Sequence, residues 1–176
     1  LLSDRIARFA VSLRDEQIPE STRVRAVHLM LDAVGLAAAT AHRDFARRTF
    51  EALSALCVQH AGTPVLTTVH DLAHRDAALM NGVLIHGLDF DDTHSPSIVH
   101  PTASVLPAIL SGLHVARDES IDPDGRAFVT AYVIGVETAC LVGRIAAGAF
   151  HARGFHPTSV AGIFGCVAAV GRLLGL

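Results

Sequence analysis

Two short phrases of the sequence place a histidine directly before a proline that hydroxyl side chains follow. They read His100-Pro101-Thr102-Ala103-Ser104 and His156-Pro157-Thr158-Ser159. Proline favours the first position of a helix and keeps the preceding residue out of the helical region, so each histidine should stand at the entrance of a helix. The free N–H groups and positive dipole end there attract anions and lower the pKa of an imidazole. The phrases predict a carboxylate site whose neutral histidines exchange a proton near pH 7.

The hydroxyl groups that follow these prolines are candidates for substrate binding. Thr102, Thr158 and Ser159 fall in the first helical turns, where they would add hydrogen-bond donors for a substrate carboxylate. The alternative is structural: the histidines would be capping or core groups satisfied by local hydrogen bonds. Both interpretations stay open at this point.

A third polar cluster comes a few residues before His100 and reads Asp89-Phe90-Asp91-Asp92-Thr93-His94. Three carboxylates within four positions repel one another, so they are predicted either to hold a metal ion or to orient a histidine and raise its basicity. For Asp91 and Asp92 the alternative is that they cap the helix that follows. Two other polar residues, His86 and Asn81, are predicted to be hydrogen-bonded residues of the core.

The elements that must position these residues are helices, because alanine is common and proline is scarce. Helices are predicted from Ser3, from Pro19, over 44–60, over 76–88, and from Pro101, Pro123 and Pro157, with 62–69 extended and 90–101 a loop. The last two helices are apolar on nearly all sides, which predicts a place in a bundle core or at a subunit contact. The predicted fold class is therefore all-α, a multi-helix bundle.

Composition excludes several classes of function. The 176 residues suit one domain, and a net charge of −3 gives no electrostatic footprint for nucleic acid. All 14 basic residues are arginine, which rules out lysine chemistry within this chain. The cysteines (Cys57, Cys140 and Cys166) are predicted to be buried thiols in a reducing compartment. The longest apolar stretch, 158–171, is shorter than the roughly 20 residues of a membrane span. We therefore expect a cytoplasmic protein without a membrane or nucleic-acid partner.

Several of these phrases together resemble the signatures of the MmgE/PrpD family. They are the phrase from Asn81 to His94, His100-Pro101, Val105-Leu106-Pro107-Ala108, and the phrase from Gly154 to Ser159. The family includes 2-methylcitrate dehydratase, cis-aconitate decarboxylase and iminodisuccinate epimerase. The resemblance implies a helical domain followed by a smaller α/β lid domain, a homodimer, and chemistry on small di- and tricarboxylates without metal or organic cofactor.

The resemblance also implies active-site roles for Asp89, Thr93, His100 and His156. The family uses a lysine and a tyrosine from further along the chain, whereas this chain has no lysine and its one tyrosine, Tyr132, lies in an apolar helix. Residues 1–176 are therefore expected to be the helical domain without the lid, a segment of a longer two-domain protein.

The predicted function is that of a cofactor-free lyase or isomerase, similar to 2-methylcitrate dehydratase, that moves a proton next to a carboxylate. His100 and His156 would share the acid and base roles, Asp89 would orient one imidazole, and Thr93 would hold a carboxylate. Two alternatives remain open. One is a metal-dependent hydrolase or lyase with the ligands Asp89, Asp91, Asp92, His94 and His100. The other is a non-catalytic helical dimerisation domain.

Overall fold

The computed structural model describes residues 1–56, 62–146 and 148–176. Its elements in chain order are α1 (Leu2–Ser12), the 3-10 helix η1 (Asp15–Gln17), α2 (Glu20–Thr40), α3 (Asp44–Leu56), β1 (Thr63–Pro64), β2 (Asp71–Leu72), α4 (His74–His86), α5 (Pro101–Asp118), α6 (Gly125–Ile145), α7 (Ala149–Ala152) and α8 (Pro157–Leu174). The two short strands pair antiparallel, and the rest of the regular structure is helical. The prediction of an all-α domain is confirmed.

The predicted helix starts lie within two residues of the observed ones. The fourth helix was predicted over 76–88 and spans His74–His86, and the start of α6 also differs by two residues. Its predicted start was Pro123, but the helix begins at Gly125 because Asp124 is the residue that caps it. The Asp124 carboxylate accepts the Ala127 N–H at 2.8 Å, which satisfies one free donor of the first turn. The predicted end of the third helix at His60, and Cys57, lie outside the described residues.

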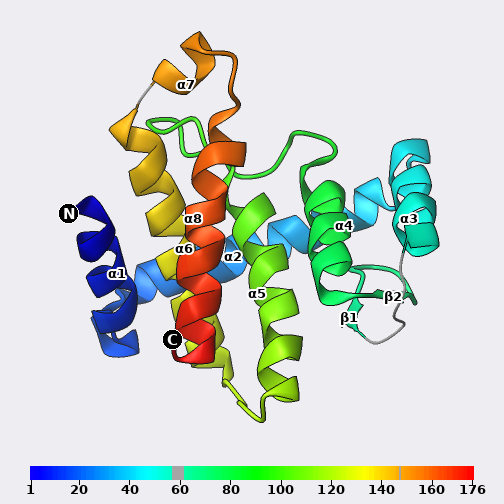
Figure 1. The fold of residues 1–176 in the computed structure, drawn as a ribbon. Helices are drawn as coiled ribbons and strands as arrows, with labels where there is room; N and C mark the ends of the chain where they lie inside the picture. The colour runs from blue at the N-terminus through cyan, green and yellow to red at the C-terminus, as the bar shows by residue number, and fades with distance from the viewer. Residues whose placement is uncertain (57–61, 147) are drawn as a thin grey trace.

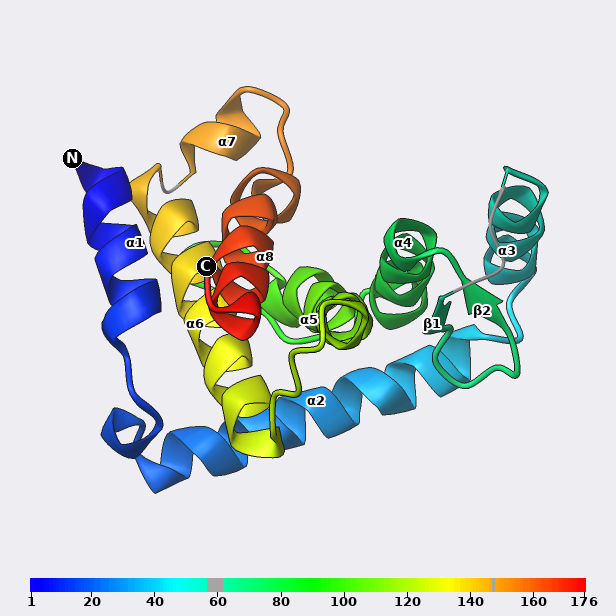
Figure 2. The same cartoon turned by 60° about the horizontal axis from the view of Figure 1, so that its bottom comes forward.

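Three helices, α5, α6 and α8, pack side by side at the centre of the fold (Figure 1). The long helix α2 runs along the base of α6, α5 and α4 (Figure 2). At one end α1 packs against α8 and α6, and at the other end α3 and the strand pair lie beside α4. This arrangement brings the N-termini of α5 and α8 close to the C-terminus of α4.

The centre is packed closely because glycines lie where α6 and α8 cross. A Cβ atom on Gly165 would stand 2.6 Å from the carbonyl oxygen of Gly135, and one on Gly135 would stand 2.6 Å from a methyl carbon of Val105 in α5. Large apolar side chains such as Leu84 and Ile134 fill the adjoining core and are fully buried. The spacing of the three helices is therefore set by direct backbone approach.

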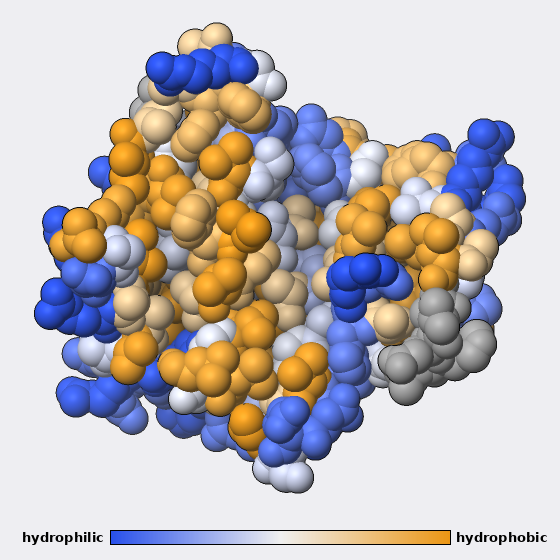
Figure 3. Space-filling model, in the orientation of Figure 1, coloured by the Kyte–Doolittle hydropathy of each residue, from blue (hydrophilic) through white to orange (hydrophobic). Residues whose placement is uncertain are grey.

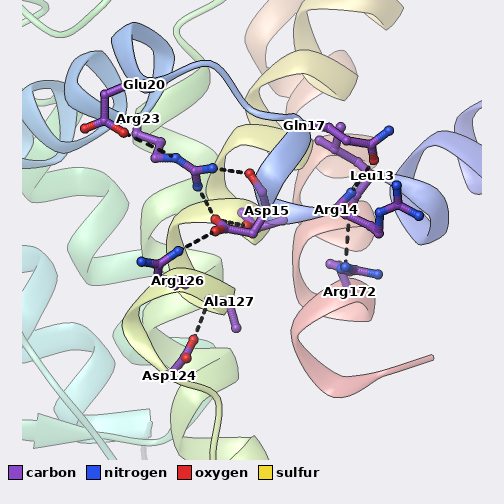
Figure 4. Close-up of polar contacts among 11 residues, drawn as sticks. Leu13, Arg14, Asp15, Gln17, Glu20, Arg23, Asp124, Arg126, Ala127 and Arg172 are labelled. Carbon is purple, nitrogen blue, oxygen red and sulfur yellow. Dashed lines mark hydrogen bonds and ion pairs between the residues drawn. The ribbon is translucent and has the colours of Figure 1, made fainter.

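A network of charges around Asp15 holds η1 against two helices (Figure 4). Its carboxylate accepts hydrogen bonds from Arg23 in α2, and from Arg126 at 3.1 Å and Thr130 at 3.2 Å in α6. Burial by itself would raise the pKa of Asp15, but the two guanidinium groups and the Thr130 hydroxyl outweigh it and hold the pKa below its usual value. The network also fixes the start of α2 against α6.

One face of the molecule is apolar and open (Figure 3). A hollow of about 1130 Å³ lies between α1, α6 and α8, and exposed side chains such as Ile163, Phe164 and Val167 line it. By length and composition alone, α6 and α8 could each cross a membrane, although 56% and 39% of their apolar windows are buried within the domain. The bent pair α2 and α3 passes the same test. The prediction that every apolar segment is too short to cross a membrane is therefore wrong, because α6 and α8 each extend beyond their most apolar run.

Candidate active site

Three histidines from three different helix ends lie together. His86 is the last residue of α4, His100 is the N-cap of α5, and His156 is the N-cap of α8. The ring centroids of His86 and His100 are 4.9 Å apart, those of His100 and His156 are 6.1 Å apart, and those of His86 and His156 are 6.2 Å apart. The two His-Pro phrases, 56 positions apart in the sequence, thus contribute to one site. Both histidines have non-helical backbone angles, and each directly precedes the proline that begins its helix, as predicted.

His86 was predicted to be a hydrogen-bonded residue of the core; it is hydrogen-bonded, but its predicted place in the core is wrong. Its side chain is 38% exposed and its Nδ1 donates to the Asp91 carboxylate, at 2.9 Å from Oδ1 and 3.1 Å from Oδ2. One signal was available in the sequence, since His86 ends a helix and is followed by a glycine and the acidic cluster. Asn81, in contrast, is fully buried and bonded to the backbone of Leu66 and Pro64, as predicted.

The neighbouring carboxylates Asp91 and Asp92 have different roles. The Asp91 side chain is only 1% exposed, and its Oδ1 lies 3.5 Å from Nδ1 of His100 in addition to its bond to His86. Asp92 turns the other way and accepts the N–H of Thr102, in the first turn of α5, at 3.3 Å. Burial raises the pKa of Asp92, and the charge of Asp91 adds to this effect. Asp91 therefore orients histidines, whereas Asp92 caps a helix.

Asp89 and Thr93 flank the ring of His100 on opposite sides. Asp89 Oδ1 lies 3.8 Å from Nε2 of His100, and Thr93 Oγ1 lies 3.4 Å from Nδ1. Asp89 has a positive φ of 56°, a conformation that aspartate tolerates better than most residues, and its side chain is 77% exposed. The cluster is thus open to solvent on the Asp89 side.

His156 is exposed at the start of α8. Its Nδ1 accepts the N–H of Thr158 at 3.3 Å, a bond typical of a helix N-terminus. Partial desolvation lowers the pKa of His156, and the nearby imidazoles of His100, His86 and His151 lower it further, against an opposing contribution from Asp89. This histidine therefore stays neutral to a lower pH than an isolated histidine does.

The three predicted substrate-binding hydroxyls all take part in internal hydrogen bonds. Thr158 Oγ1 accepts the backbone N–H of His100 at 2.9 Å and so joins the start of α8 to the start of α5. Ser159 is exposed and its Oγ donates to the carbonyl of His156 at 2.8 Å. Thr102 lies in the core, where its hydroxyl shares a 2.5 Å hydrogen bond with Tyr132. The structure therefore places Thr102 away from the site opening.

Within the described residues, one group of side chains has the spacing of a metal centre. A ligand atom from each of His86, Asp89, Asp91 and His100 lies within 4.8 Å of the others. Mixed imidazole and carboxylate ligands suit Zn²⁺ or Fe²⁺. The predicted ligand set is brought together only in part, since Asp92 caps α5 and the His94 ring bonds to Ser97 Oγ at 2.7 Å.

Known proteins with similar sequences include two relatives. The chain is 40% identical to the cis-aconitate decarboxylase of Homo sapiens over 104 residues, which are 57% of the chain and 21% of that protein. It is 28% identical to the cis-aconitate decarboxylase-like protein oryM of Aspergillus oryzae over 175 residues, which are 97% of the chain and 36% of that protein. The chain thus spans about a fifth to a third of the length of these relatives.

The match to a known family extends over almost the entire chain, from residue 4 to residue 176. It includes both His-Pro phrases, the acidic cluster and every helix except the first residues of α1. The chain belongs to the MmgE/PrpD family, of which it is an N-terminal domain.

Proposed function

We propose that this chain supplies the histidine cluster of a lyase or isomerase that breaks a bond next to a carboxylate of a small di- or tricarboxylate. The observation that carries the proposal is the meeting of His100 and His156, each the N-cap of an 18-residue helix, with their rings 6.1 Å apart. Each helix start offers positive potential to a carboxylate, and each imidazole offers a proton-transfer group beside it.

The chemistry requires both features. A carbon next to a carboxylate is a weak acid, and its deprotonation or decarboxylation builds negative charge on the carboxylate oxygens. Fixed donors directed at those oxygens supply a large part of the rate enhancement in such reactions. In the proposed site one imidazole accepts the proton while helix dipoles and the other imidazole stabilise the charge. Asp89 stabilises the imidazolium that forms, and the Thr93 hydroxyl helps to hold a carboxylate.

The relatives suggest the first substrate to test. Both are named as cis-aconitate decarboxylases or as similar to them. Dehydration and epimerisation of related acids begin by removing a proton next to a carboxylate, and decarboxylation builds a similar charge by loss of CO₂, so 2-methylcitrate, citrate and an amino-dicarboxylate belong in the same test. We propose that the reaction needs no metal or organic cofactor.

We also propose a homodimer, formed through the exposed apolar face of α8. Sedimentation that gives a monomer would contradict the homodimer.

Proton NMR of the metal-stripped full chain in D₂O with these acids tests the proposal. We expect deuterium at a carbon next to a carboxylate, or a new product. His156→Ala should lower the rate about 100-fold or more. The matched control is His28→Ala, since His28 is exposed on α2 outside the cluster. A chain that leaves every acid unchanged contradicts the proposed function.

The metal-dependent alternative is favoured by one observation, the spacing of His86, Asp89, Asp91 and His100. Elemental analysis of the purified protein separates the two proposals. A stoichiometric metal whose removal abolishes turnover would replace the cofactor-free proposal. The non-catalytic alternative, a dimerisation domain, predicts that no polycarboxylate raises the melting temperature.

A further inference from the structure

We propose that the fold gives His100 and His156 opposite tautomers, so that Nε2 of His100 accepts a proton while the Nε2–H of His156 donates a hydrogen bond, and that Asp91 is the positioning residue of the acceptor. The roles of acceptor and donor rest on the proposed function. The tautomers themselves are properties of the resting chain and can be measured without turnover.

Two acceptors face Nδ1 of His100. The Asp91 carboxylate lies 3.5 Å away, and its side chain is buried, so that water does not compete for it. The Thr93 hydroxyl lies 3.4 Å away and can donate its own hydrogen to the carbonyl of Asp91 at 3.4 Å, which leaves a lone pair directed at the imidazole. A neutral imidazole has a single N–H. The Asp89 carboxylate faces Nε2, but it is farther away, at 3.8 Å, and water solvates its exposed side chain, so the two nearer acceptors place the N–H at Nδ1. The lone pair of Nε2 is then free for a substrate proton.

His86 receives the same tautomer from the same carboxylate. Its Nδ1 lies within 3.1 Å of both Asp91 oxygens, and its ring lies next to that of His100. One buried carboxylate thus positions two imidazoles. The two imidazoles offset the buried charge of Asp91, which would be costly if it were unpaired.

The start of α8 fixes the opposite tautomer for His156. Its Nδ1 faces the N–H of Thr158, and a backbone N–H can only donate, so this nitrogen must carry the lone pair. The proton of the neutral ring therefore lies on Nε2. Partial desolvation and the neighbouring imidazoles lower the pKa of His156, which favours the neutral ring.

The two tautomers give His100 and His156 different roles in removing a proton next to a carboxylate. The substrate C–H bond breaks and its proton goes to Nε2 of His100, while the electron pair stays on the substrate as an enediolate. The charge that develops on the carboxylate oxygens accepts the hydrogen bond from Nε2–H of His156. Asp89, 3.8 Å from Nε2 of His100, then stabilises the new imidazolium. His100 then returns the proton to the same carbon, which is exchange, or gives it to a hydroxyl on the next carbon, whose C–O bond breaks as the electron pair forms the new C=C bond and water leaves.

Histidine tautomers can be read directly from two-bond ¹H–¹⁵N correlations. The full chain would be labelled with ¹⁵N-histidine, measured without ligand at about pH 8, above the usual histidine pKa, and assigned with His86→Gln, His100→Gln and His156→Gln. We expect Nδ1–H for His86 and His100 and Nε2–H for His156. The same tautomer in His100 and His156, or Nδ1–H in His156, would overturn the proposal.

Asp91→Asn tests the positioning role. The amide is an uncharged and therefore weaker acceptor, and it replaces one of the two oxygens near Nδ1 of His86 with a donating NH₂ group. We therefore expect His86 or His100 to move toward the Nε2–H tautomer while His156 keeps its own. The matched control is Asp32→Asn, which changes an exposed carboxylate on α2 and should leave all three unchanged. Unaltered signals of His86 and His100 in Asp91→Asn would refute the role of Asp91.

Kinetics then tests the roles separately from the tautomers. Glutamine keeps an N–H near the place of Nε2 but has no basic nitrogen. His156→Gln should therefore retain more activity than His156→Ala, whereas His100→Gln should be as impaired as His100→Ala. If glutamine and alanine lower the activity equally at both positions, the assignment of acceptor and donor is overturned. Opposite tautomers in a chain that leaves every polycarboxylate unchanged would instead contradict the proposed function.

Discussion

Replacement of Gly165 by alanine should destabilise the domain, because this glycine lies where α8 crosses α6. The new Cβ atom would stand 2.6 Å from the carbonyl oxygen of Gly135 and 3.0 Å from the Cβ of Ala139. The first contact is with a backbone atom that cannot rotate away. The two helices must therefore separate, and the packing around them weakens.

The magnitude follows from two opposing effects. Alanine is favoured over glycine inside a helix by about 1 kcal/mol. Overpacking of a close core contact costs roughly 1–3 kcal/mol, and a clash with backbone belongs at the upper end of that range. We expect a net loss of about 2 kcal/mol in the free energy of unfolding, which for a domain of this size lowers Tm by roughly 4–8 °C.

Urea and thermal unfolding followed by circular dichroism measure this loss. The matched control is Gly35→Ala, because Gly35 is exposed inside α2 and a Cβ atom there meets nothing within 4 Å. Because it has no steric cost, this variant should gain up to about 1 kcal/mol in the free energy of unfolding. If Gly165→Ala proves as stable as Gly35→Ala, the argument that backbone approach sets the spacing of α6 and α8 is refuted.

Three further predictions concern other parts of the fold. Asp15→Asn should lower Tm at pH 7; because its folded pKa is depressed, the difference should shrink as the pH falls below about 4, where the unfolded carboxylate protonates. Tyr132→Phe should cost about 1 kcal/mol by removing its hydrogen bond with the buried Thr102 hydroxyl, and a urea double-mutant cycle with Thr102→Val should show that the two losses are not additive. Burial raises the pKa of Cys140 and Cys166 to about 11, so in a Cys57→Ser variant at pH 8 these two thiols should react with a thiol reagent much more slowly in native than in unfolded protein.

The sequence by itself determined the local features of this protein. The pre-proline rule placed His100 and His156 at helix entrances, and the helical class followed from composition and periodicity. These features depend on residues within one or two turns of one another, so they can be read without knowledge of the fold. The cap of α6 shows the limit even here, because both Asp122 and Asp124 suit a cap and the helix uses the second.

Only the tertiary structure decided which polar groups meet. Thr158 reaches His100 across 58 positions, Thr102 reaches Tyr132 across 30, and neither pairing leaves a periodic signal in the sequence. The same holds for His86, which became part of the site because α4 ends against the start of α5. Spacing along the chain shows which residue types are available for chemistry. Burial and direction, which decide their tautomers and partners, arise when helices distant in sequence pack together.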